Sequence, residues 1–203
     1  MNDNSKSITK GQAIEQVASQ MSGPLNFKEF TRRVLALWPS SAKNPQAGIR
    51  KALQYEYLGK NLLFLDKQSL IPIRLAMPGV QFRVPLTRQE IQRGWMFVYP
   101  ALQYMAQQNQ PAEEYRLEEL DGYSIPVNLV TVKIRVKTVF GDSHVEETAF
   151  DLKGWYKKHT LRRGDSLLVT VLDWEYGRFR LEPEPARTRQ KHDAEIQAQN
   201  QAL

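Results

Sequence analysis

The residues best suited to a chemical role in this sequence are cations and amides gathered in one short segment, 43–54 (KNPQAGIRKALQ). Pro45 suits the first turn of a helix, where its missing N–H costs nothing. At about 100° per residue, one side of this helix carries Ile49, Ala52 and Leu53. The other side is small and polar, with a cation at its flank. A slim face with long hydrogen-bond donors around it is suited to a major groove.

We expect the exposed side of this segment to contact nucleic acid. Arg50 and Lys51 are placed for phosphates or guanine edges, and Gln54 for adenine. Lys43 and Asn44 stand at the helix N-terminus, where backbone N–H groups attract phosphate. The expected contact set is Lys43, Asn44, Ala47, Arg50, Lys51, Gln54, Lys60 and Lys67. The alternative interpretation is a solvated helix face on a domain that binds protein rather than DNA.

The charge of the chain is distributed in favour of a polyanion partner for the N-terminal part. The 203 residues carry a formal net charge of +6. Residues 1–86 contain 12 Lys and Arg against 5 Asp and Glu, whereas residues 114–186 contain 11 against 13. A basic domain beside a nearly neutral one suggests a polyanion partner for the first domain only, the alternative being that the charge serves solubility. With the groove-suited face of residues 43–54, the expected polyanion is double-stranded DNA.

Three helices and a hairpin are predicted over residues 8–76. The first helix is capped by Thr9 and carries an apolar face up to Met21; the second is capped by Asn26 and ends at Pro39. The third helix runs from Pro45 to about Leu58. Strands are expected at 61–65 and 70–75, with a turn at 66–69 between them. This order is that of a winged helix-turn-helix, with Lys60 and Lys67 flanking the wing.

Residues 80–185 are predicted to form a small, strand-rich domain with a barrel-like fold. A strand at 81–86 precedes a segment capped by Thr87 and Glu90, and residues 106–114 are expected to be a loop. A strand at 127–139 carries three alternating cations, Lys133, Arg135 and Lys137, and turns at 141–142. A short helix at 152–159 and strands at 166–172 and 178–182 follow. Residues 186–203 are expected to be a polar tail, so the predicted class is α+β with two domains.

Residues 8–75 resemble the HARE-type helix-turn-helix. The resemblance rests on Ala13-Ile14-Glu-Gln-Val17, on Gly23-Pro24-Leu25-Asn-Phe27-Lys-Glu29-Phe30, on Asn44-Pro45-Gln-Ala-Gly-Ile49-Arg-Lys-Ala-Leu53 and on Leu62-Leu-Phe64. This is the winged helix of the bacterial RNA polymerase delta subunit, of Asx-like chromatin proteins and of some restriction enzymes. The resemblance covers about a third of the chain. It implies DNA binding in transcription or restriction, or assembly with that machinery without direct DNA contact, and it supplies no catalytic residue.

The segment 150–171 resembles a DNA-binding pseudobarrel. Its features are Phe150-Asp-Leu152, then a short helix at Trp155, then Leu161-Arg-Arg-Gly164-Asp165 before a strand. Gly164 would supply a positive φ, and Asp165 would hold the turn by accepting backbone N–H groups. The first half of such a barrel is not recognisable, so the resemblance assigns no DNA-contacting residue here. The expected role of the turn is structural.

Nothing in the sequence points to an enzyme. There are no cysteines, and the three histidines (His144, His159 and His192) do not have the spacing of a metal site. We therefore expect no catalytic residue, metal or cofactor. The aromatic pairs Tyr55/Tyr57 and Trp155/Tyr156 are expected in cores. The N-terminus has no secretory h-region and no apolar run is long enough for a membrane, so the expected location is the cytoplasm.

Overall fold

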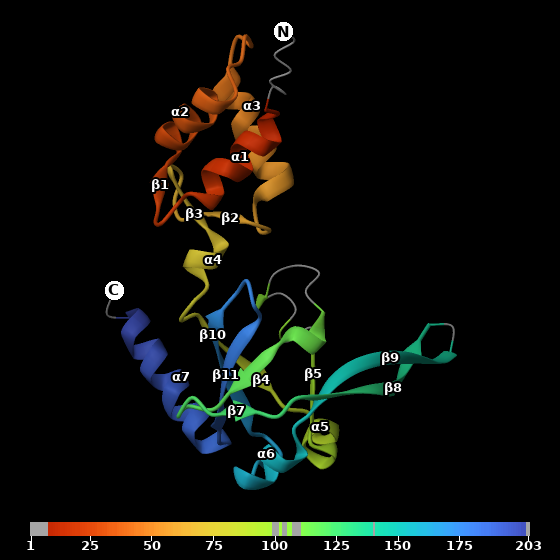
Figure 1. Ribbon diagram of the computed structural model, residues 1–203. Helices are drawn as coiled ribbons and strands as arrows, with labels where there is room; N and C mark the ends of the chain where they lie inside the picture. Colours follow the sequence, from red (N-terminus) through yellow and green to blue (C-terminus); the bar gives the residue numbers. More distant parts are fainter. Residues whose placement is uncertain (1–7, 99–101, 103–104, 107–110, 140, 202–203) are drawn as a thin grey trace. The chain divides into compact units, whose positions relative to one another are not determined.

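The chain consists of two compact units, Met1–Met77 and Pro78–Leu203 (Figure 1). The structure is a computed structural model that describes residues 8–98, 102, 105–106, 111–139 and 141–201. Helices and strands occur in both units, so the chain has the α+β composition expected from its sequence.

The N-terminal unit contains helices and a small three-stranded sheet. Its elements are α1 (Lys10–Ser19), β1 (Leu25–Asn26), α2 (Phe27–Leu37), α3 (Pro45–Ala52), a π-helical turn (Leu53–Tyr57), β2 (Leu62–Phe64), β3 (Ser69–Pro72) and α4 (Ile73–Ala76). The strand order is β1-β3-β2, and both pairings are antiparallel.

Local capping explains where the first helices of this unit begin. Thr9 and Gln12 form a capping box at the start of α1, and the Asn26 side chain accepts the Lys28 N–H at the start of α2. These caps satisfy N–H groups that have no partner within a helix. The apolar faces of the helices then pack together around the core residues Ala13, Ile14, Val17, Met21, Phe30, Val34, Ile49, Ala52, Leu53, Tyr57, Leu62 and Leu70. The expected caps at Thr9 and Asn26 are confirmed.

The third helix differs from its prediction at its C-terminal end. The α-helix stops at Ala52, and the next turn is π-helical, with the Leu58 N–H donating to the Leu53 carbonyl at 2.9 Å. Tyr57 is buried, and its hydroxyl donates to the Gly11 carbonyl at 3.4 Å. Tyr55 is 75% exposed. The core placement expected for Tyr55 is therefore wrong. Tyr55 is two positions from the buried Leu53 and two from the buried Tyr57, and this offset places it on the opposite side of the helix.

The strand expected at 70–75 is also shorter than predicted. β3 ends at Pro72, which pairs with Leu62, and α4 begins at Ile73. β2 has only three residues, so the chain has no strand to pair with beyond Leu62. Arg74 on α4 donates to the carbonyl oxygens of Ser19 and Met21, at 3.0 and 2.7 Å. The end of the unit is thus fastened to the end of α1.

The C-terminal unit is richer in strands. Its elements are β4 (Gln81–Pro85), α5 (Arg88–Arg93), β5 (Trp95–Phe97), a 3-10 turn (Ala112–Glu114), β6 (Arg116–Glu118), β7 (Ser124–Ile125), β8 (Asn128–Thr138), β9 (Gly141–Asp151), α6 (Lys153–Lys158), β10 (Ser166–Asp173), β11 (Arg178–Glu184) and α7 (Ala186–Gln201). The expected capping box of Thr87 and Glu90 is present at α5. In the loop expected at 106–114, residues 107–110 lie outside the described residues, and Ala112–Glu114 form the 3-10 turn.

The strands of this unit form two sheets. One has the order β4-β10-β11-β6-β7, and the other β5-β9-β8. Within the part of the chain that the structure describes, these sheets do not close into a barrel, so only the α+β class is shown. Apolar side chains from β10, β11 and β6 are fully buried, including Val169, Phe179 and Leu117. Trp155 and Tyr156 are buried as expected, at 6% and 5% exposure.

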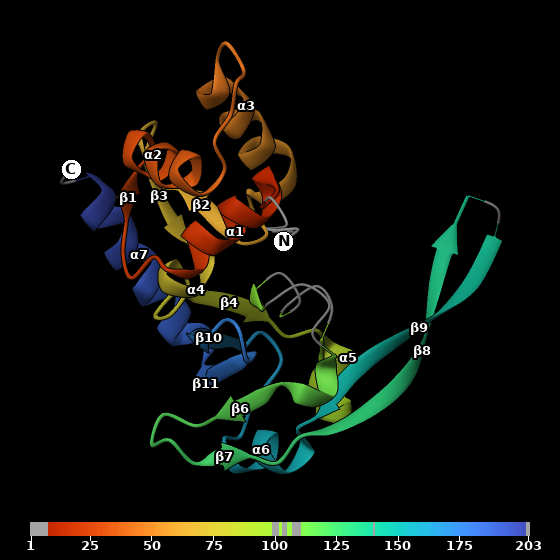
Figure 2. The same ribbon diagram turned by 45° about the horizontal axis from the view of Figure 1, so that its top comes forward.

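The hairpin of β8 and β9 extends well beyond the strand β5 that it pairs with (Figure 2). β5 pairs only with Ala149–Asp151 on β9, and we call residues 133–138 and 141–146 the hairpin arm. The turn expected at 141–142 is wrong, because Gly141 and Asp142 belong to β9 and pair with Thr138 and Lys137. Val145 of the arm is 40% exposed, and Val139, which directly follows Thr138 of the arm, is 93% exposed.

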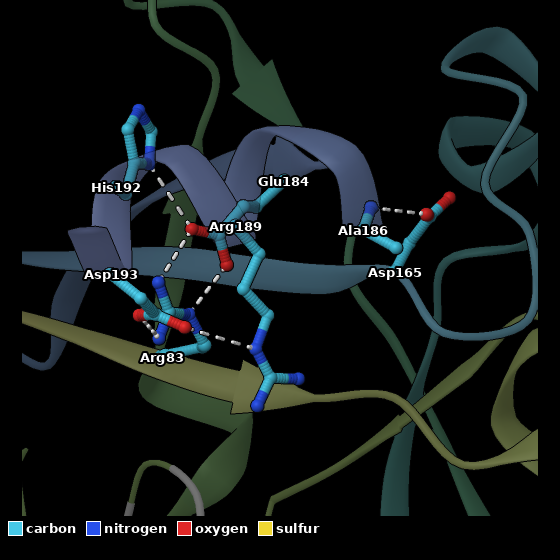
Figure 3. A network of polar contacts seen from close by, with 7 residues as sticks. All are labelled: Arg83, Asp165, Glu184, Ala186, Arg189, His192 and Asp193. Carbon is cyan, nitrogen blue, oxygen red and sulfur yellow. Dashed lines mark hydrogen bonds and ion pairs between the residues drawn. The ribbon is translucent and has the colours of Figure 1, made fainter.

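The residues expected to be a polar tail form the helix α7. The Ala186 N–H, at its start, donates to the Asp165 carboxylate at 2.9 Å. One turn or two later, His192 lies 3.2 Å from Glu184, and Asp193 lies 2.9 Å from Arg83 (Figure 3). Long-range ion pairs of this kind have no signature in the local sequence, which is why composition alone suggested a tail.

Candidate nucleic-acid interface

The helix α3 presents the face that the sequence predicted. The Asn44 side chain caps it by accepting the Ala47 N–H at 3.1 Å, and Pro45 occupies the first helical position. Ile49 and Ala52 are buried against the core. Lys43, Asn44, Ala47, Lys51 and Gln54 are exposed. The capped end and the polar side of α3 are thus accessible to a ligand.

Arg50 lies in an aromatic cluster instead of pointing freely outward. Its guanidinium carbon is 4.2 Å from the centroid of the Phe27 ring and 5.7 Å from that of Phe64. The two rings are 6.4 Å apart. A guanidinium stacked on an aromatic face keeps its N–H donors in its own plane, at the edge of the contact. Arg50 therefore joins α3 to α2 and β2, and it holds its donors in a fixed orientation.

The turn between β2 and β3 is held rigidly beside the start of α2. The Asp66 carboxylate accepts the N–H groups of Gln68 and Ser69 at 2.6 and 2.7 Å, and these bonds lower the pKa of Asp66. The Phe27 N–H donates to the Gln68 carbonyl at 2.5 Å. Lys28 follows Phe27 and Lys67 precedes Gln68, the two residues that this bond joins. Lys28 was not among the residues predicted to bind nucleic acid, although its place after the Asn26 cap marked it as an exposed first-turn residue.

Other cations of the N-terminal unit are already engaged. Arg32 and Arg33 both bond Glu29, at 2.7 and 2.8 Å, and they lower its pKa to about 2. Arg74 is used on backbone carbonyls. By contrast, no carboxylate partner occurs in the described part of the chain for the lysines Lys28, Lys43, Lys51, Lys60 and Lys67. The available positive charge is therefore that of lysines around α3 and the β2–β3 turn.

The predicted residues do not all meet at one place. Lys43 precedes α3, and Lys60 follows the π-helical turn that ends at Tyr57. The 13 helical residues from Pro45 to Tyr57 span about 20 Å at helical rise. Lys43 and Lys60 thus lie at opposite ends of this helical segment. The structure groups Arg50 with the start of α2 and leaves Lys60 apart from that cluster.

The cationic face expected on residues 133–137 is largely neutralised. Lys133 lies 3.5 Å from Glu146, and Arg135 pairs with Asp142 on the facing strand. The antiparallel register sets these carboxylates opposite or diagonal to the cations. We therefore do not include the hairpin arm in the interface.

One cavity of the C-terminal unit gathers several titratable groups. It has a volume of about 630 Å³, and its lining includes Glu119, Trp155, Lys158 and His159. The Glu119 carboxylate is 2.7 Å from the Lys158 amine and 3.6 Å from His159 Nε2. Among the described lining residues there is no serine, threonine or cysteine to act as a nucleophile. No group of three potential metal ligands occurs within the described ranges of the chain.

Comparison with known proteins gives no assignment for this chain. It matches no family model, and neither the curated proteins nor the solved structures include a match to it. Separately, none of the helices in the described residues is both long and apolar enough to cross a membrane.

Proposed function

We propose that residues 8–76 form a winged helix-turn-helix that binds double-stranded DNA. The observation that carries the proposal is the group of exposed lysines around α3 and the β2–β3 turn, for which the described residues supply no carboxylate partner. The strand order β1-β3-β2 behind three helices supports the architecture. In this proposal α3 lies along a groove and the β2–β3 turn is the wing. No catalytic step is part of the proposed function, which we place in transcription regulation or restriction-type DNA recognition.

The roles of the contact residues differ in the proposal. Lys43 and Lys51 contact phosphates as mobile point charges, and Gln54 faces the bases. Arg50 contributes hydrogen-bond donors that the Phe27 ring holds in place. Lysine contacts to phosphate release counterions, so they give an affinity that falls with salt and depends little on sequence.

Fluorescence anisotropy with a labelled, mixed-sequence duplex at two or more salt concentrations tests the proposal. The informative variant is Lys43→Gln/Lys51→Gln, with Arg32→Gln/Arg33→Gln as its control. Both remove two charges from the same unit, but the control arginines are already paired with Glu29. We expect the first variant to flatten the slope of log affinity against log salt by about two and to bind on the order of tenfold more weakly at low salt.

Two results would contradict DNA binding at this surface. One is absence of binding by the parent protein at low salt. The other is an equal loss in the variant and its control, which would show that only net charge matters. Backbone amide spectra of each variant would establish that the fold is kept.

A second candidate function is docking on a protein of the transcription or restriction machinery without DNA contact. Leu65, at the β2–β3 turn, is 55% exposed, and Tyr55 is 75% exposed. Docking in this proposal requires these side chains to belong to one contiguous apolar patch, the kind of surface that marks a protein contact. A partner that is retained after nuclease treatment and is lost on Leu65→Gln substitution, with duplex affinity unchanged, would support docking in place of DNA binding.

A further inference from the structure

A second group of cations lies on the C-terminal unit, around α5, α6 and the loop after α6. A cavity of about 330 Å³ is lined there by residues that include Gln92, Lys153, Lys157, Thr160 and Arg162. Lys153 and Lys157 are one helical turn apart, so they lie on the same face of α6. Arg162 approaches from the loop. Three cations thus line one cavity.

The carboxylates close to this cavity are used on backbone N–H groups. Glu90 is buried and accepts the N–H groups of Thr87 and Phe97, at 2.8 and 3.3 Å. Asp151 accepts the Lys153 N–H at 3.1 Å. Asp165 accepts the Arg162 N–H at 2.7 Å and, as Figure 3 shows, the Ala186 N–H. These three carboxylates therefore bind backbone N–H groups at α5, at the start of α6 and in the loop after it, and not the cations of the cavity.

The cations, in contrast, point to solvent. Lys153, Lys157 and Arg162 are exposed, as are Arg88 and Arg163 nearby in sequence. None of these five has an ion pair or a side-chain hydrogen bond to a carboxylate among the described residues. A cavity lined by charge of one sign concentrates its field and attracts the opposite ion. The field at this surface therefore favours an anionic ligand.

The backbone beneath the cavity is fixed. Gly94 has φ +74°, and a Cβ there would lie 2.5 Å from the Lys153 Cα. The Leu152 N–H donates to the Gly94 carbonyl at 2.7 Å, and the Tyr156 hydroxyl donates to the Trp95 carbonyl at 2.9 Å. Thr160 has φ 54°, an unusual value for a residue with a side chain. These contacts hold α6 against the end of α5 and set the positions of its lysines.

We propose that this cavity binds a phosphate group. A guanidinium fork, two ammonium groups and a threonine hydroxyl offer the donors that phosphate oxygens accept. The phosphate is that of a nucleic-acid backbone or of a free phosphate ester, which present the same chemistry. All of these residues belong to the C-terminal unit, so the proposal does not depend on DNA binding by α3.

Amide chemical shifts of the full chain, labelled with ¹⁵N, test the proposal. The probes are a 20-base-pair duplex and, separately, inorganic phosphate, both at low salt. We expect saturable shifts at the amides of Gly94, Lys157 and Thr160, which line the cavity. Shifts with inorganic phosphate at millimolar concentration would identify a free phosphate ester as the source. Shifts with the duplex alone would identify the nucleic-acid backbone.

Matched variants give the test its specificity. Lys153→Gln/Lys157→Gln/Arg162→Gln should weaken the response about tenfold or more, whereas Lys133→Gln/Arg135→Gln/Lys137→Gln removes three cations from the same unit and should not. The Lys43→Gln/Lys51→Gln variant should also keep the response, which separates this site from the proposed DNA interface. No shift with either probe, or the same loss in the cavity variant and in the Lys133 control, would overturn the proposal.

Discussion

Glu184 is a carboxylate whose charge is held inside the C-terminal unit. Its side chain is fully buried at the end of β11, and Arg83 donates two hydrogen bonds to it at 2.5 and 2.8 Å. His192 on α7 lies 3.2 Å away (Figure 3). A buried charge costs stability unless it is paired and hydrogen-bonded. The Glu184 carboxylate joins the sheet to α7 through His192. Its buried charge is stable there only because Arg83 is paired with it.

Replacing Glu184 with glutamine should destabilise the C-terminal unit by about 3 kcal/mol. The expected loss lies at the lower end for broken buried pairs because Arg83 stays a quarter exposed and keeps its contact with Asp193. Urea unfolding followed by circular dichroism would measure it. Glu146→Gln is the control, since the Lys133–Glu146 pair is well exposed and its loss should cost about 0–1 kcal/mol.

The Arg83–Glu184 pair also predicts the direction in which the stability of the C-terminal unit changes in acid. The hydrogen bonds from Arg83 hold the pKa of Glu184 below its ordinary value, in spite of burial. A carboxyl with a lowered folded pKa contributes stability that is full above the unfolded value of about 4.3 and is lost as pH falls through the folded pKa. The parent should therefore lose stability in acid more steeply than Glu184→Gln. Parallel pH profiles for the two proteins would rule out this role.

At the scale of elements, the parts that local chemistry controls could be predicted. Thr9, Asn26 and Thr87 were expected to cap helices, and each does so. A cap depends on residues within one helical turn, so the sequence contains the whole signal. The early end of β3 at Pro72 depends on the length of β2, which no local pattern determines. The π-helical turn after Ala52 ends at the buried Tyr57, whose hydroxyl donates to the Gly11 carbonyl on α1. A contact with so distant a residue also has no signal in the local sequence.

Charge at the candidate sites was harder to predict, because pairing is non-local. Lys133 and Arg135 alternate along a strand as expected, but the register of β9 sets Glu146 and Asp142 against them. Arg50 was expected on the outer face of α3, whereas two aromatic rings from other elements hold it. Periodicity identifies which side of an element a residue occupies, but it does not identify the neighbour it meets there.

The hairpin arm should be the most easily opened ordered part of the C-terminal unit. Its strands have each other as their strand partners, beyond the three residues of β9 that pair with β5. A two-stranded ribbon is marginally stable by itself. We expect its hydrogen-bonded amides to exchange with solvent about a hundredfold faster, or more, than those of β10, which lies between β4 and β11. Hydrogen exchange followed by NMR would measure both. Equal protection would mean that another surface covers the arm.

At the scale of the whole molecule, the two units differ in net charge. Residues 1–77 contain 11 Lys and Arg against 5 Asp and Glu, and residues 78–203 contain 17 against 17. The neutral total of the C-terminal unit conceals the cations at α6, because its carboxylates are placed elsewhere or cap backbone groups. A sum over a domain reports its average field, whereas a ligand responds to the local one. Net charge therefore pointed to α3 and missed the cavity beside α6.

The N-terminal unit should fold by itself, since its core of residues 13–70 is built only from its own unit. The fragment 1–77 is expected to unfold cooperatively, at the temperature of one of two transitions in the full chain. Differential scanning calorimetry of both proteins would show this. A fragment without a cooperative transition would mean that the N-terminal core needs the rest of the chain.

The same fragment determines how many units contact one duplex. If α3 and the α6 cavity bind the same DNA, the full chain neutralises more phosphates than residues 1–77 do. Three additional contacts, from Lys153, Lys157 and Arg162, would steepen the slope of log affinity against log salt by about three. The Lys153→Gln/Lys157→Gln/Arg162→Gln variant of the full chain should then return to the slope of the fragment. Identical slopes for the fragment and the full chain would assign duplex binding to the N-terminal unit alone and leave the cavity to a free phosphate ester.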